Sequence, residues 1–211
     1  MTIVTARNVL LLHGIWNTRL WLAPLAARLR GAGFAPRVFG YASVFGGLEQ
    51  ALPQLIQALR DAAPTHLLGH SLGGMVALEA LRRAPDLPVA RVVCLGTPLR
   101  GSATARWLSA HPVLGKVLGR SADTLCQAGF SAWDGVAEVG MVAGDVPRGL
   151  GRLVRAFDDV SDGTVRVAET HVAGLSDHIV VPASHSGLVL SAEAARQASA
   201  FLTHGRFDRG L

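Results

Sequence analysis

The strongest chemical signal in the sequence is the pentapeptide 69–73 (GHSLG), which is centred on Ser71. An apolar segment of strand type precedes it over 66–69, and a helical pattern rich in Ala, Leu and Met follows to about Arg83. This context predicts a nucleophile elbow, a sharp turn that lifts the serine hydroxyl out of the backbone. Glycines flank the serine because a Cβ there would crowd the turn and the helix beside it. The following helix points its positive N-terminal end toward the place where an oxyanion would form.

A histidine is needed to activate this hydroxyl, because serine attacks a carbonyl at neutral pH only when a base takes its proton. In open parallel sheets, functional side chains gather beyond the C-terminal ends of the strands. His185 lies just after a predicted strand over 178–183 and just before a predicted helix over 188–202. We therefore favour His185 as the base over its alternative as a helix-capping or surface histidine. His13 and His70 are interpreted as supports for the turns that contain them.

The acid that would orient this histidine has two main candidates. Asp145 directly follows a predicted strand, whereas Asp162 lies in a later loop beside Gly163, which permits a tight turn. Asp158 and Asp159 are adjacent alternatives, and each aspartate could instead be an ordinary loop residue that accepts backbone N–H groups. Spacing alone does not separate Asp145 from Asp162.

Acyl transfer also requires donors for the negative oxygen of the tetrahedral intermediate. We expect one donor to be the backbone N–H of Leu72, which follows the nucleophile, and the other to be the N–H of Ile15, in the loop after the first strand. Because both donors are backbone groups, Ile15→Ala is expected to have a mild effect. No histidine or cysteine pair has the spacing of metal ligands, so neither a metal nor a cofactor is expected.

The elements that must position these residues follow a regular alternation. Predicted strands lie at 8–13, 34–40, 66–69, 89–95, 136–144 and 178–183, and predicted helices at about 17–29, 48–60, 72–83 and 188–202, with a short helix or loop at 149–157. Such alternation indicates right-handed βαβ units and a parallel sheet covered by helices on both faces. Between 103 and 135 the pattern loosens into short helices and loops, whose apolar side chains could wall an acyl pocket near the site.

The composition favours one compact α/β domain over residues 1–211. Half of the residues are hydrophobic and 17% are charged, which excludes a disordered chain. No apolar run is long enough to cross a bilayer and no signal peptide is evident, so we expect a cytoplasmic protein without stable membrane insertion. The net charge is +5, but the nineteen arginines and one lysine are scattered and no nucleic-acid motif accompanies them, so no nucleic-acid partner is expected. The oligomeric state is not indicated.

Several segments together resemble the α/β-hydrolase superfamily, and more narrowly its small lipase-like serine esterases. They are His13-Gly14 after the first strand, 69–74 (GHSLGG), 96–102 (GTPLRGS), 161–165 (SDGTV) and His185 before the last helix. The resemblance implies that the triad acid is the aspartate of the Asp-Gly-x-Val element, which is Asp162 and not Asp145. The chain begins at what resembles the superfamily's third strand, so we expect a minimal version without the first strands and without a full cap domain.

The resulting hypothesis is a serine hydrolase that cleaves carboxylic esters of small molecules or lipids, with short or medium acyl chains preferred. Ser71, His185 and Asp162 would form the triad, and Ile15 and Leu72 would supply the oxyanion hole. The same triad could serve a triacylglycerol lipase, a thioesterase or an acyltransferase. A non-catalytic binding module on this fold is a further alternative.

Overall fold

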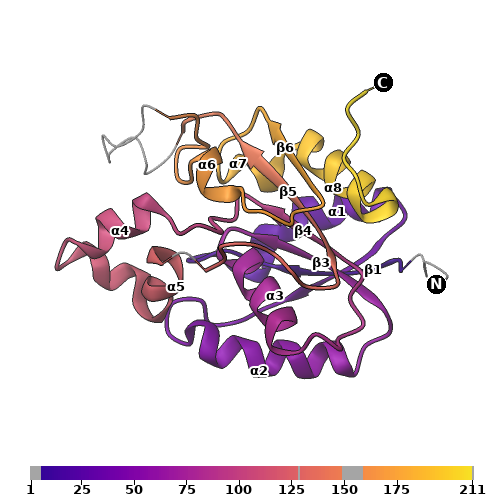
Figure 1. Ribbon diagram of the computed structural model, residues 1–211, viewed down its shortest axis with the longest axis horizontal. Helices are drawn as coiled ribbons and strands as arrows, with labels where there is room; N and C mark the ends of the chain where they lie inside the picture. The colour runs from indigo at the N-terminus through magenta and orange to yellow at the C-terminus, as the bar shows by residue number, and fades with distance from the viewer. Residues whose placement is uncertain (1–5, 128, 149–158, 211) are drawn as a thin grey trace.

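The computed structural model describes residues 6–127, 129–148 and 159–210, and its centre is one parallel sheet (Figure 1). Its strands are β1 (Asn8–Leu12), β2 (Ala35–Phe39), β3 (Thr65–His70), β4 (Arg91–Leu95), β5 (Glu138–Gly144) and β6 (Asp177–Val181). The strand order is β2-β1-β3-β4-β5-β6, and every neighbouring pair is parallel. The C-terminal ends of all six strands therefore lie along one edge of the sheet. The predicted fold class is confirmed.

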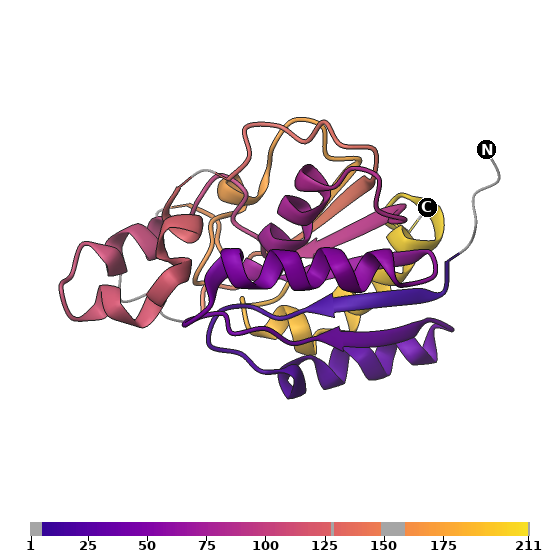
Figure 2. The same ribbon diagram turned by 90° about the horizontal axis from the view of Figure 1, so that it is seen from below.

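Helices cover both faces of the sheet, as Figures 1 and 2 show. The described helices are η1 (Arg19–Leu22), α1 (Ala23–Gly31), α2 (Gly47–Arg60), α3 (Leu72–Arg83), α4 (Ala103–Ser109), η2 (Leu114–Ser121), α5 (Ala122–Cys126), α6 (Val167–Thr170), α7 (Gly187–Leu190) and α8 (Ala192–His204). Helices α2 and α3 pack on one face, and α1 and α8 pack on the other. None of these helices is both long and apolar enough to cross a membrane.

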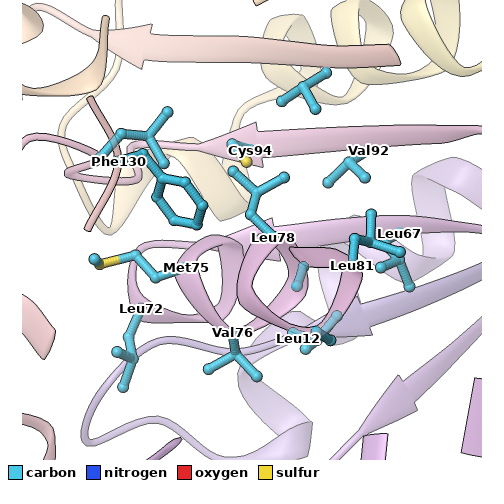
Figure 3. Close-up of a cluster of buried hydrophobic side chains, with 14 of the residues drawn as sticks. Leu12, Leu67, Leu72, Met75, Val76, Leu78, Leu81, Val92, Cys94 and Phe130 are labelled. Atoms are coloured by element: carbon cyan, nitrogen blue, oxygen red, sulfur yellow. The ribbon is translucent and has the colours of Figure 1, made fainter. Parts of the chain in front are cut away.

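The two faces carry separate apolar cores, one beneath α2 and α3 and one beneath α1, α7 and α8. Strands β3 and β4 are buried along their whole length, because helices cover them on both sides. This burial explains why they read as continuous apolar runs rather than as alternating patterns. Figure 3 shows α3 at the centre of the first core, where its side chains meet those of the sheet. The residues labelled there are Leu12, Leu67, Leu72, Met75, Val76, Leu78, Leu81, Val92, Cys94 and Phe130.

Two predicted helices differ from the structure in their boundaries. The helix predicted over 17–29 begins as the 3-10 turn η1, and α1 starts only at Ala23, next to Pro24, whose missing N–H suits a first helical turn. The single helix predicted over 188–202 is divided into α7 and α8. The break falls at Ser191, whose hydroxyl accepts a hydrogen bond from the N–H of Ala194 at 3.1 Å and so starts a new helix. The segment predicted at 149–157 lies outside the described residues.

The loosely patterned segment that begins at residue 103 forms α4, η2 and α5, which stand together at one end of the molecule (Figure 1). Loops at the C-terminal edge of the sheet hold this group in place. The indole N–H of Trp16 donates to the carbonyl of Val117 at 2.7 Å, and the N–H of Arg120 donates to the carbonyl of Val44 at 2.9 Å. The segment therefore lies over the edge where the predicted site residues emerge.

Candidate active site

Ser71 occupies the turn between β3 and α3 in a backbone conformation that few side-chain-bearing residues adopt. Its φ is 54° and its ψ is −122°. The surrounding structure holds this conformation through three hydrogen bonds: the N–H of Ser71 donates to the carbonyl of Leu95 at 2.8 Å, and the carbonyl of Ser71 accepts from the Thr97 hydroxyl and the Gly74 N–H, both at 3.0 Å. Strain of this kind costs about 1–3 kcal/mol and persists only where neighbouring groups enforce it.

The glycines around Ser71 allow β3, α3 and β1 to approach one another closely. A Cβ at Gly69 would lie 2.5 Å from the carbonyl carbon of Gly73, and a Cβ at Gly73 would lie 2.7 Å from that of Leu12. Both obstacles are backbone atoms, which cannot rotate away as a side chain can. The two glycines of the predicted elbow are thus required by packing.

Replacing Gly69 by alanine is therefore expected to destabilise the protein by about 3 kcal/mol or more, since overpacking against backbone forces the elements apart. Gly31→Ala is the matched control, because no atom lies within 4 Å of a Cβ at that position in α1 and alanine is the better helix former. Urea unfolding of both variants measures the effect. Equal stability of Gly69→Ala and the unmodified protein would contradict the packing argument.

His185 and Asp162 form a short, buried pair. Nδ1 of His185 lies 2.7 Å from Oδ2 of Asp162, whose side chain is 1% exposed. The other carboxylate oxygen of Asp162 accepts the backbone N–H groups of Thr164 at 2.9 Å and Val165 at 2.7 Å. A proton on Nδ1 of His185 would donate to this carboxylate, and in that tautomer of the neutral ring Nε2 carries no proton. Nε2 can therefore accept a proton, as a general base must.

This pair lies beside the Ser71 turn. The His70 ring, one residue before Ser71, is 4.9 Å from the His185 ring between centroids, and Nε2 of His70 donates to the His185 carbonyl at 3.0 Å. On the β4 side, a Cβ at Gly96 would lie 3.1 Å from Oδ2 of Asp162 and 3.2 Å from Nδ1 of His185. The structure thus brings the predicted acid and base to the same sheet edge as Ser71.

Asp145 and Asp159, the other acid candidates within the described residues, do not pair with His185. The backbone N–H of Asp145 donates to the Val181 carbonyl at 3.3 Å, and no bond joins its carboxylate to His185 in the described part of the chain. Asp159 faces the guanidinium of Arg166 at 3.4 Å, and Asp158 lies outside the described residues.

His70 is buried without charge beneath the site. Burial, with a smaller contribution from nearby His185, lowers the pKa of His70 from 6.5 to about 3. Since its Nε2 donates to the His185 carbonyl, Nδ1 carries no proton. His70 thus holds the His185 backbone in place, rather than the turn that contains His70 itself.

This burial makes the stability depend on pH. Below about pH 6.5 the unfolded chain protonates His70 whereas the folded protein does not, so the free energy of unfolding falls as the pH decreases from 6.5 toward about 3. His70→Gln keeps a donor for the His185 carbonyl and removes the titrating group. Urea unfolding at about pH 8 and pH 5 should show a smaller loss of stability for His70→Gln than for the unmodified protein, and an equal loss would contradict the assignment.

The loop after β1 runs directly beside Ser71. A Cβ at Gly14 would lie 3.1 Å from Cβ of Ser71, and Ile15 lines the same pocket as Ser71. Nδ1 of His13 donates to the Gly14 carbonyl at 2.8 Å, and Nε2 of His13 accepts from the N–H of Tyr41 at 3.4 Å, which braces the loop. Leu72 is the first residue of α3, where backbone N–H groups have no acceptor within the helix. Both predicted oxyanion donors thus lie on segments adjoining Ser71.

A small apolar pocket of about 40 Å³ opens at Ser71. The loop after β1, the segment α4–α5 and the loop that carries Asp162 all contribute to its wall. Its apolar lining comprises Ile15, Trp16, Pro98, Ala105, Leu108, Leu118, Leu125 and Val165. The segment from 103 onward contributes Ala105, Leu108, Leu118 and Leu125 to this lining.

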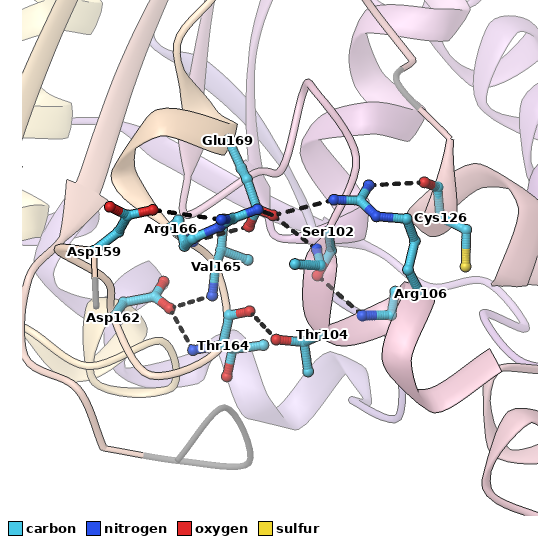
Figure 4. A network of polar contacts seen from close by, with 12 residues as sticks. Ser102, Thr104, Arg106, Cys126, Asp159, Asp162, Thr164, Val165, Arg166 and Glu169 are labelled. Carbon is cyan, nitrogen blue, oxygen red and sulfur yellow. Dashed lines mark hydrogen bonds and ion pairs between the residues drawn. The ribbon is translucent and has the colours of Figure 1, made fainter. Parts of the chain in front are cut away.

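A polar network that was not predicted joins α4 to the Asp162 loop (Figure 4). The buried carboxylate of Glu169 accepts the N–H of Ala103 at 2.7 Å and the N–H of Arg166 at 2.9 Å. The Thr104 hydroxyl donates to the Thr164 carbonyl at 2.6 Å. These bonds fix the loop that presents Asp162 against the segment that walls the pocket. The sequence offered only an Arg166–Glu169 pair at helical spacing as a signal for this role.

Comparison with known proteins agrees with this architecture. Among solved structures, the mature lipase BlEst2 of Bacillus licheniformis is 18% identical over 95% of this chain and 93% of its own, with a TM-score of 0.72. Phospholipase PlaB from Legionella pneumophila, in complex with thio-NAD, is 18% identical over 91% of this chain but only 56% of its own, with a TM-score of 0.71. Carboxylesterase CesB from Bacillus subtilis is 16% identical over 95% of this chain and 84% of its own, with a TM-score of 0.58.

At identities this low, the similarity to these solved structures shows a shared fold. A search of curated protein sequences gives no significant match. A family model described as the alpha/beta hydrolase fold matches residues 9–139, which span β1 to β5 and include the Ser71 turn. The chain therefore belongs to the alpha/beta hydrolase fold family.

Proposed function

We propose that this chain is a serine hydrolase that cleaves carboxylic esters with short or medium acyl chains. The observation that carries the proposal is the 2.7 Å pair of His185 and Asp162 beside the strained Ser71 turn. Hydrolase and esterase neighbours of the same fold support the reaction class, and the small apolar pocket at Ser71 supports an acyl group of limited size.

In the proposed mechanism, Nε2 of His185 takes the Ser71 proton while the Ser71 oxygen forms a bond to the ester carbonyl carbon. The N–H groups of Ile15 and Leu72 donate to the resulting oxyanion. The bond to the alcohol oxygen then breaks, and His185 returns its proton to that oxygen. Water attacks the acyl-enzyme with the same general-base assistance, which releases the acid and restores Ser71. Throughout these steps Asp162 stabilises the imidazolium.

Lipase activity is a second candidate, which a specific observation favours. Trp16, which lines the pocket, is 46% exposed. Phe45 and Val113, which lie on segments next to η2, are 85% and 77% exposed. Exposed apolar side chains of this kind could contact an aggregated lipid substrate.

Labelling with a fluorophosphonate probe, followed by a panel of p-nitrophenyl esters and an emulsified triglyceride, tests the proposal. We expect labelling, together with the highest kcat/KM on short or medium acyl chains in solution. Activity confined to the emulsion would favour the lipase. Absence of both labelling and hydrolysis would leave the non-catalytic binding module.

A further inference from the structure

A second hollow adjoins the Ser71 site on the opposite side of the loop after β1. This polar groove has a volume of about 390 Å³. Its lining residues are His13, Asn17, Thr18, Arg19, Gly40, Tyr41, Ala42, Gln50, Ala51 and Gln54. The loop residues Ile15 and Trp16 face the apolar pocket, whereas His13 and Asn17 line the groove, so one short loop separates the two hollows.

Gly14 lies between Ser71 and Asn17, a residue of the groove lining. A Cβ at this glycine would lie 3.1 Å from Cβ of Ser71 and 3.4 Å from Nδ2 of Asn17. The Asn17 amide and the Ser71 side chain therefore both lie next to Gly14. A substrate whose carbonyl lies at Ser71 could extend into the apolar pocket on one side and into the groove on the other.

Arg19 supplies a cation held against the wall of the groove. Its Cγ and Cδ lie 2.8 and 2.9 Å from the position that a Cβ at Gly40 would occupy, and its Nε occupies the same space. Only glycine at position 40 leaves room for the arginine side chain to lie there. Within residues 6–127, 129–148 and 159–210, no ion pair involves Arg19.

The chemistry of the groove suits an anion. Beside Arg19 it presents the amides of Asn17, Gln50 and Gln54, and no carboxylate lines it among the described residues. A guanidinium binds carboxylate and phosphate oxygens through paired, charge-assisted hydrogen bonds. The pocket on the other side of the loop has a mostly apolar lining, and no cationic side chain lines it among the described residues.

We propose that this groove binds an anionic group, a carboxylate or a phosphate, on the alcohol part of the ester, while the apolar acyl part occupies the pocket at Ser71. This inference rests on the proposed ester hydrolase function. It narrows the substrates to esters whose alcohol part carries a carboxylate or a phosphate. Arg19 is the specificity-determining residue.

A matched pair of esters tests the inference. The hexanoyl ester of 3-(4-hydroxyphenyl)propanoate carries a negative charge, and the hexanoyl ester of the corresponding propanamide is neutral. Two methylene groups separate the carboxylate or amide from the ring, so the leaving phenols have nearly the same pKa. For the unmodified protein, kcat/KM should be about tenfold higher for the carboxylate, as one charge-assisted hydrogen bond provides. In Arg19→Gln this ratio should fall to near one.

Arg30→Gln is the control, since it removes the same charge from an exposed position on α1, remote from the lining of the groove. It should leave the kcat/KM values of both esters unchanged. A hexanoyl ester of the same scaffold that carries a phosphate monoester is the third substrate. The anion whose ester has the larger kcat/KM relative to the neutral ester is the preferred one.

Three outcomes would overturn the inference: equal kcat/KM for charged and neutral esters, a preference that survives Arg19→Gln, or a preference that Arg30→Gln also removes. In each of these the proposed hydrolase function stands. If no ester is hydrolysed and the fluorophosphonate does not label the protein, the proposed function itself has failed.

Discussion

Replacement of Ser71 by alanine is expected to abolish fluorophosphonate labelling and to lower kcat for ester hydrolysis by a factor of about 10⁵ or more. Without the hydroxyl no acyl-enzyme can form, and the residual rate comes from substrate binding and the oxyanion donors alone. Stopped-flow or steady-state assays with a p-nitrophenyl ester measure the loss of turnover, and gel fluorescence measures the labelling. The positive φ at position 71 strains serine and alanine alike. The substitution therefore adds little strain, and the variant is expected to fold.

Ser102→Ala is the matched control for this experiment. Ser102 lines the same pocket, but its hydroxyl accepts the N–H of Ala105 at 3.2 Å and caps α4. This variant should keep its labelling and lose about 1 kcal/mol of stability through the missing cap. Labelling that disappears in Ser102→Ala and survives in Ser71→Ala would show that the nucleophile is not Ser71.

Replacement of Asp162 by asparagine is expected to lower kcat by about 10⁴ while KM changes little. The amide carries no charge to stabilise the imidazolium. Its NH₂ group would also face Nδ1 of His185 and favour the tautomer with the proton on Nε2, which cannot act as a base. Steady-state kinetics at about pH 8 measures the effect, and thermal unfolding checks that the variant is folded.

Asp145→Asn provides the comparison, because this aspartate also follows a strand at the same sheet edge yet makes no bond to His185 in the described residues. It should retain kcat within about twofold, as surface substitutions away from a site usually do. A large loss of kcat in Asp145→Asn with little change in Asp162→Asn would assign the acid to Asp145 instead.

Much of the fold was predictable from local pattern. The buried strands β3 and β4 read as short apolar runs because helices cover both of their faces. The Ser71 turn was visible because Gly69 and Gly73 flank the serine within five consecutive residues. These features depend on contacts between residues close in sequence or on the burial of a whole element. Helix boundaries were less accurate, because a single capping residue such as Ser191 divides a pattern that is continuous in hydrophobicity.

The residues alone left Asp145 and Asp162 equivalent, because the position of a loop aspartate depends on how the loop returns to the sheet. That path is determined by bonds between distant segments, such as those from Glu169 to Ala103 and from Thr104 to Thr164. The polar groove depends likewise on tertiary contact, since Arg19 lies against Gly40 from another part of the chain. Local sequence thus specified the Ser71 turn and the strands, whereas long-range packing decided which acid faces His185 and which cation lines the groove beside the loop after β1.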